Sequence, residues 1–313
     1  MFRFVSTANP VELKRRYLAK YNYKLLQKKL VGLLTLYPDI KDALPTDITA
    51  KKLLIGNFKY LAKVYCAFVD VMGNKSDEDK KTILEKFVQG GFRYDTHSSD
   101  IKQFLLDPTN EFDIYNCVYC DLESVREFTK VNGRKVRKFE TEHVLDKGEC
   151  PLVAMSLYNF VPSCGTCNGA DLKGTRTIGD IEEEIAKLSP TAEGYDFDEK
   201  VNFVVDVLNP NAPDLRSSDH PDDYEISFDL KNKLYQKSID LFELKQRYNE
   251  KLVKEELLFW RDKRRNNPDN YIQQYADIRH VSFDEIFEEY FELKKNRSNH
   301  APMEKARREV MMM

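Results

Sequence analysis

Two pairs of cysteines constrain this chain more than any other feature of its sequence. Cys117 and Cys120 form one Cys-x-x-Cys step, and Cys164 and Cys167 form a second. Each step can direct two thiolates at one metal ion, and two steps together complete the tetrahedral four-sulfur site typical of structural zinc. The sequence therefore predicts a structural Zn²⁺ held by these four cysteines.

The residues between the two pairs, 121–163, form a longer interval than the roughly 15–20 residues of a short four-cysteine zinc unit. The interval must therefore hold structure of its own. It contains the acid-histidine step Glu142-His143 and, further on, Asn159, while Asn168 directly follows the last cysteine. Side chains that can bind a metal ion or move a proton thus gather within a segment whose two ends the zinc would fix.

From Asn116 to Gly174 the sequence resembles the HNH, or ββα-metal, endonuclease superfamily in its cysteine-supported form. The shared pattern is Cys-x-x-Cys, an acid-His step, an Asn before a second Cys-x-x-Cys-Asn, and then Lys-Gly. The resemblance implies a role for each matching position: Glu142 as the acidic metal ligand, His143 as the general base, Asn159 as the asparagine that ties the loop, Asn168 as the second metal ligand, and Lys173 as a phosphate contact.

The chemistry of these residue types agrees with that implication. The carboxylate of Glu142 and the amide oxygen of Asn168 suit a catalytic Mg²⁺, or Mn²⁺, which prefers oxygen ligands and accepts phosphate oxygen. The metal ion would stabilise charge on the scissile phosphate while neutral His143 takes a proton from the attacking water. We therefore expect a phosphodiester hydrolase, and the family implies a 5′ phosphate and a 3′ hydroxyl as products.

The charge of the chain limits how it can bind nucleic acid. A formal net charge of −3 gives no global attraction to a polyanion, so contacts must come from local basic patches. DNA is the substrate that we expect, although the sequence leaves DNA or RNA, and single or double strands, open. The predicted nucleic-acid contacts are Arg134, Lys135, Arg137 and Lys138 before the site, and Lys173 and Arg176 after it.

Two other functions compete with catalysis. In the first, the four cysteines support a non-catalytic zinc-stabilised module that binds nucleic acid or protein, and Glu142-His143 is incidental. In the second, a Cys-x-x-Cys step acts in thiol redox chemistry, but such pairs usually act alone at a helix start in a βαβ setting that this sequence does not show. The combination of Glu142, His143 and Asn168 favours the nuclease, because a pure binding module does not need it.

The wider sequence suggests a setting for the activity. No apolar run has the length of a signal peptide or a membrane span, so we expect a cytoplasmic protein that does not enter a membrane. The segment from Val207 to Tyr248 weakly resembles the tail of HNH proteins that work beside an ATPase in anti-phage systems such as Septu and some retrons. This resemblance implies a defence role and a regulatory partner, either an ATPase or a second copy of the chain.

The pattern of apolar residues predicts an α+β, mostly helical protein with helical regions on both sides of the segment that carries the paired cysteines. The resemblance implies that this central segment is a zinc-supported ββα-metal (HNH) module. We divide the chain into an N-terminal helical domain over 1–91, the zinc-supported nuclease module over 92–178, and a C-terminal helical region with a short strand over 179–313.

Individual helices can be placed from their capping signals and apolar spacing. Asn9-Pro10 predicts the start of a helix that runs to about Tyr37, and the capping box at Ser282 predicts another. A long helix is expected from Ser238 to Arg265, with Leu252 on its inner side. The final residues, 301–313, are expected to fray.

Overall fold

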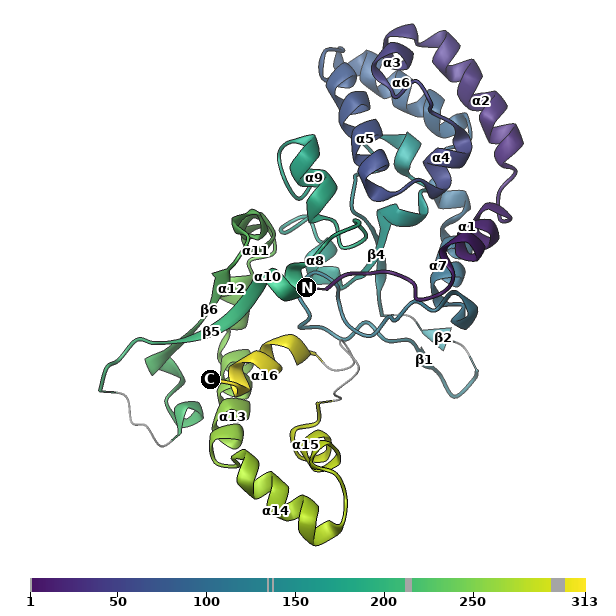
Figure 1. Cartoon of the computed structure of the whole chain (residues 1–313). Coiled ribbons are helices and arrows are strands. Elements are labelled where there is room, and N and C mark those ends of the chain that lie inside the picture. The colour runs from purple at the N-terminus through teal and green to yellow at the C-terminus, as the bar shows by residue number, and fades with distance from the viewer. Residues whose placement is uncertain (1, 134, 137, 212–215, 294–301) are drawn as a thin grey trace. The chain divides into compact units, whose positions relative to one another are not determined.

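The computed structural model describes residues 2–133, 135–136, 138–211, 216–293 and 302–313. The chain forms two compact units: the first comprises Met1–Tyr119 and Val125–Asp196, and the second comprises Cys120–Ser124 and Phe197–Met313. The described residues are mostly helical, with small antiparallel sheets of two strands each (Figure 1). The mostly helical α+β class is thus confirmed, while the three-part division of the chain stays a prediction.

The N-terminal part of the first unit is helical, as expected. Its helices are α1 (Pro10–Leu18), α2 (Tyr23–Leu36), α3 (Pro38–Ala43), α4 (Ala50–Ile55), α5 (Phe58–Gly73), α6 (Asp77–Gln89) and α7 (Ser98–Leu106). Asn9 caps α1 through its side chain, and Pro10 is the first helical residue. The prediction of one helix as far as Tyr37 is wrong, because the chain turns after Leu18 and the side chain of Asn22 starts α2 by accepting from the amide of Leu25.

Strands and short helices make up the rest of the first unit. They are β1 (Phe128–Thr129), β2 (Lys135–Val136), β3 (Glu140–His143), β4 (Phe160–Ser163), α8 (Gly165–Asn168) and α9 (Glu182–Leu188). Short 3₁₀ turns at Pro151–Val153 and Leu157–Asn159 shape the loop between β3 and β4. The two strands pair antiparallel, from Glu140 opposite Ser163 to His143 opposite Phe160. The order along the chain is therefore strand, long loop, strand and short helix.

The loop between β3 and β4 is attached to the N-terminal helices. The hydroxyl of Tyr17 in α1 donates to the carbonyl oxygen of Met155 over 2.9 Å. Ser156 donates to the carbonyl of Leu53 in α4. These bonds join segments that are far apart in the sequence, so α1 and α4 hold the loop between β3 and β4 in a defined position.

The second unit combines one hairpin with a set of helices. Its elements are α10 (Phe197–Lys200), β5 (Val201–Val207), β6 (Tyr224–Leu230), α11 (Gln236–Leu241), α12 (Leu244–Tyr248), α13 (Lys251–Arg265), α14 (Asp269–Arg279), α15 (Phe283–Phe291) and α16 (Glu304–Met311). β5 and β6 pair antiparallel along their whole length. The short strand expected in the C-terminal region is present in this hairpin, and the capping box at Ser282 is confirmed.

Two predictions for this unit are wrong. The expected helix from Ser238 to Arg265 is divided into α11, α12 and α13, because Glu243 adopts a left-handed conformation with a φ of 51° and Glu250 leaves the helical region with a ψ of 138°. Leu252 lies at the start of α13 and is 71% exposed, so it is not on the inner side. The expected fraying at the C-terminus is also contradicted, because Val310 and Met311 of α16 are buried and the helix packs against α13 and β5. Residue 301 lies outside the described residues.

Hydropathy adds one further observation about the fold. Among the described residues, no helix combines the length and the apolar character that crossing a lipid bilayer requires.

Candidate active site

The four paired cysteines converge. Cys117, Cys120, Cys164 and Cys167 are all buried, and their sulfur atoms lie within 4.8 Å of one another. A tetrahedron of Zn–S bonds of about 2.3 Å separates its sulfur atoms by about 3.8 Å, so the cluster has a suitable size. All six cysteines are among the described residues and none forms a disulfide. The cluster can therefore hold a structural metal ion such as zinc, as the sequence predicted.

Backbone contacts place the cysteines beside β4. The sulfur of Cys164 accepts a hydrogen bond from the amide of Cys167 over 3.4 Å, in the first turn of α8. The amide of Val118, inside the first pair, donates to the carbonyl of Pro162 in β4 over 3.2 Å. A metal ion in the cluster would thus brace the strand and the short helix that follow the candidate catalytic residues.

His143 ends β3 in an aromatic environment. Its ring lies 4.5 Å from the ring of Tyr94 and 5.0 Å from that of Phe160, measured between centroids. Its Nε2 is 3.1 Å from the carbonyl oxygen of Ala154. Because a carbonyl oxygen only accepts, Nε2 carries the proton and Nδ1 is left as the acceptor nitrogen. Burial lowers the pKa of His143 to about 3, so the ring is neutral at physiological pH.

Asn159 closes the loop that separates the two strands. Its side-chain oxygen accepts from the amide of Leu145 over 2.7 Å. Its side-chain nitrogen donates to the carbonyls of Leu145 and Val153, each over 3.0 Å. A single buried amide thereby joins the start of the loop to its middle. Asn159 thus closes the loop, while its place in a nuclease site stays a prediction.

Glu142 precedes His143 on β3, and its carboxylate is paired with a lysine. The ammonium group of Lys173 lies 2.6 Å from Oε1 of Glu142 and donates to the carbonyl of His143 over 2.9 Å. Lys173 is 0% exposed. Burial raises the pKa of Glu142, although the charge of Lys173 acts in the opposite direction. The lysine that was predicted to contact phosphate therefore lies inside the unit, where it neutralises the predicted metal ligand.

Asn168, the second predicted metal ligand, lies at the end of α8. Its side-chain nitrogen donates to the carboxylate of Glu140. Since Glu140 and Glu142 are two residues apart on one strand, their side chains project from the same face, so Asn168 is attached to the face that carries Glu142. Its side-chain oxygen, the atom that would bind a metal ion, accepts no hydrogen bond from the described residues.

The predicted nucleic-acid contacts are only partly described. Arg134 and Arg137 lie outside the described residues, and Lys135 forms part of β2. Lys138 is exposed and lies 5.9 Å from the centroid of the Phe128 ring. Arg176 is also exposed and donates to the carbonyl of Asp171. Lys138 and Arg176 thus remain accessible to a ligand.

Two contributors to this site were not found in the sequence. The carbonyl of Ala154 fixes the proton on His143, and Tyr94 packs against the ring. Every residue has a backbone carbonyl, so residue types cannot reveal that the carbonyl of Ala154 makes this contact. Tyr94 lies in a 3₁₀ turn before the first cysteine, outside the segment that carries the motif.

Comparison with known proteins adds no relative. No family model, no curated protein and no solved structure matches this chain.

Proposed function

We propose that this chain is a metal-dependent HNH endonuclease that hydrolyses phosphodiester bonds of nucleic acid, with DNA as the expected substrate. The observation that carries the proposal is the arrangement of β3, a closed loop, β4 and α8, beside a four-cysteine cluster. Glu142 and His143 end the first strand, Asn159 closes the loop, and Asn168 ends the helix. This is the order of elements and residue types that the ββα-metal resemblance implies.

The chemical types of the donor atoms suit a magnesium or manganese ion. Glu142 offers a carboxylate oxygen and Asn168 an amide oxygen, and a hard divalent cation prefers such ligands. When bound, the ion would stabilise negative charge on the scissile phosphate. The pairing of Lys173 with Glu142 affects metal binding, because a metal ion that binds Glu142 must compete with the ammonium group of Lys173 for the same carboxylate.

The protein's own residues supply the proton transfer. His143 is neutral because it is buried, and its Nε2 is committed to Ala154, so Nδ1 takes the proton from the attacking water. The hydrogen bond to Ala154 also fixes the orientation of the ring. Asn159 keeps the loop that contains Ala154 closed, and it thereby acts as a positioning residue for His143.

The test is cleavage of plasmid DNA with Mg²⁺ or Mn²⁺ by the wild type and by His143→Gln. Glutamine can still donate a hydrogen bond to Ala154 but is not a base, so we expect a rate loss of about 10²–10⁴ with the fold and zinc content unchanged. His220→Ala, which alters an exposed histidine in the second unit, serves as the matched control and should cleave normally. Equal cleavage by wild type and His143→Gln, from preparations free of other nucleases, would exclude the proposed role.

The buried ion pair favours one alternative, a non-catalytic zinc-stabilised module that binds nucleic acid or protein. In that case Lys173 neutralises Glu142 permanently and the pair only supports the fold. A wild-type protein that binds DNA but does not cleave it with either metal ion would support the alternative.

Under the nuclease proposal, the helical regions around the site remain available to dock a regulatory partner, for which an ATPase of an anti-phage system is our suggestion.

A further inference from the structure

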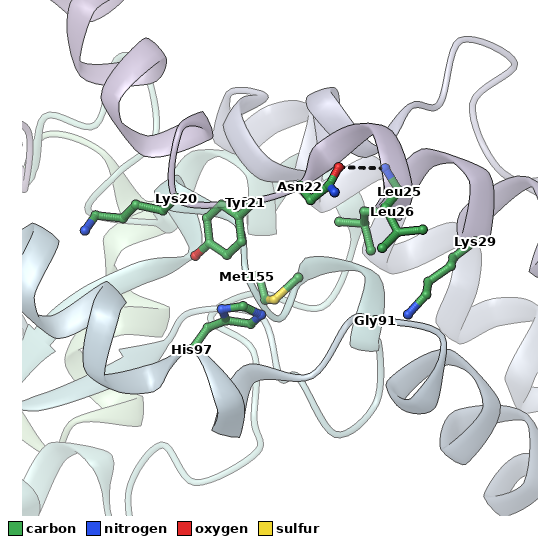
Figure 2. Close-up of a pocket in the computed structure, with 9 residues that line it drawn as sticks. All are labelled: Lys20, Tyr21, Asn22, Leu25, Leu26, Lys29, Gly91, His97 and Met155. Carbon is green, nitrogen blue, oxygen red and sulfur yellow. Dashed lines mark hydrogen bonds between the residues drawn. The ribbon is translucent and has the colours of Figure 1, made fainter.

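The first unit has two surface features that the proposed mechanism does not use. One is a cavity of about 210 Å³ beside α2, with Tyr21, His97 and Met155 in its lining (Figure 2). The ammonium groups of Lys20 and Lys29 lie at opposite ends of this cavity, so they cannot hold one anionic group. The other feature is the hairpin of β1 and β2, which lies at the edge of the unit (Figure 1) and combines basic side chains with an exposed aromatic ring.

The hairpin segment, residues 125–138, is strongly basic. It contains six basic residues and one acidic residue, whereas the whole chain has a net charge of −3. Arg126, Lys130 and Lys138 are exposed, and none of them forms an ion pair with the described residues. Glu127, the acidic residue of the segment, is half-buried. The hairpin therefore presents positive charges that no ion pair neutralises, and these favour a polyanionic ligand.

One face of the hairpin carries an open aromatic ring. Phe128 in β1 is 45% exposed. Its partner across the hairpin is Val136, and paired residues of antiparallel strands project from the same face. The ammonium group of Lys138, two residues further along, lies 5.9 Å from the centroid of the Phe128 ring. The hairpin thus places a cation beside a ring that still has much of its surface free.

The hairpin leads directly into the candidate active site. Lys138 is followed by the buried Phe139 and then by β3, which carries Glu142 and His143. Four residues of fully extended chain span at most about 14 Å, so the Cα atoms of Lys138 and Glu142 lie within that distance of each other. A nucleic-acid strand that contacts Lys138 would therefore lie near the residues proposed to cleave it.

We propose that this face of the hairpin binds single-stranded nucleic acid, with Lys138 at a backbone phosphate and Phe128 against an unpaired base. Proteins that bind single strands combine basic side chains along the backbone with aromatic rings on which the bases stack. In a duplex, proteins contact the edges of the bases in the grooves, whereas an unpaired base can present its flat face to Phe128. The inference rests on the proposed function for nucleic acid as the ligand, but binding at the hairpin does not require cleavage.

The test is a binding titration followed by fluorescence anisotropy. Labelled DNA and RNA strands of about 16 nucleotides, each alone and annealed to its complement, are titrated with the full chain without added Mg²⁺ or Mn²⁺. We expect one single strand to bind at least about tenfold more tightly than its duplex. Phe128→Ala should weaken binding of that strand about tenfold, the usual effect of losing one base–aromatic stack. Phe128→Trp keeps an aromatic ring and should bind like the wild type.

Lys138→Gln tests the phosphate contact separately. It should weaken binding and should reduce the slope of log K against log salt by about 0.7, the value for one phosphate of a single strand. Phe128→Ala should leave this slope unchanged, because it removes no charge. The matched controls are Lys28→Gln and Tyr23→Ala, which alter an exposed lysine and an exposed aromatic ring of α2 in the same unit. Both controls should bind like the wild type.

Three results would overturn the inference: no binding of either single strand, duplexes that bind as tightly as the single strands, or equal effects of Phe128→Ala and Tyr23→Ala. His143→Gln should bind the strands like the wild type. Loss of cleavage with unchanged binding therefore bears on the proposed nuclease, and loss of the single-strand preference bears on the hairpin, so the two proposals can fail separately.

Discussion

The buried pair of Lys173 and Glu142 allows a quantitative test of the site's construction. The substitution Lys173→Met keeps most of the volume of the side chain but removes its ammonium group from beside Glu142, whose side chain is 7% exposed. Removing one partner of a buried ion pair leaves an uncompensated buried charge and typically costs about 3–5 kcal/mol. The carbonyl of His143 loses its lysine donor as well. We therefore expect the free energy of unfolding of the first unit to fall by that amount.

The matched control is the ion pair between Lys187 and Glu183 in the same unit. Its two atoms lie 2.7 Å apart, but the side chains are 59% and 72% exposed. Exposed pairs contribute about 0–1 kcal/mol, so Lys187→Met should have little effect. The double variant Glu142→Gln with Lys173→Met should be more stable than Lys173→Met alone, because it leaves no buried charge behind.

Urea unfolding of the full chain measures these differences. Far-ultraviolet circular dichroism follows the helices of both units, while the fluorescence of Trp260, the only tryptophan of the chain, follows the second unit. Lys173→Met should shift the first signal more than the second. The reasoning would be refuted if Lys173→Met and Lys187→Met cost the same, or if the double variant were no more stable than Lys173→Met.

Three further outcomes follow from the fold. Elemental analysis should find about one zinc per chain, and Cys164→Ser should destabilise the first unit; a metal-free protein of unchanged stability would argue against a structural zinc site. Asn159→Ala removes three buried hydrogen bonds and should cost about 3 kcal/mol or more in urea unfolding, so a loss below about 1 kcal/mol would contradict its loop-closing role. Val310→Asp places a charge in the buried face of α16 and should lower the stability followed by Trp260, whereas Met312→Asp, at a position 74% exposed, should change it by less than about 0.5 kcal/mol. Equal effects of the last two would mean that α16 frays.

Features that depend on neighbouring residues were predicted well from the sequence. Asn9 and Ser282 cap helices because their side chains reach amides two or three residues away, and such contacts do not require the rest of the fold. The two cysteine pairs are similar, since their spacing already restricts which metal site they can form.

Features that depend on distant contacts were not predicted. Leu252 matched the helical spacing of a single long helix, but the left-handed residue Glu243 changes the direction of the chain before it. The last helix was expected to fray because its sequence is charged, yet its apolar residues pack against α13 and β5. Lys173 was expected to contact phosphate because the resemblance implied that role, and only the fold shows that Glu142 is its partner.

The hydrogen bond from the hydroxyl of Tyr17 in α1 to the carbonyl of Met155 has a consequence for the orientation of His143. Adjacent carbonyls of one loop are held by α1 on one side and by His143 on the other. The two carbonyls lie in neighbouring peptide planes that are joined at Met155, so a movement of the chain at Met155 also displaces the peptide plane of Ala154. A shift of α1 would therefore change the orientation of the His143 ring through this loop, without a direct contact between α1 and the ring. If the chain has the proposed nuclease activity, mutations in α1 should therefore reduce that activity while the protein stays folded.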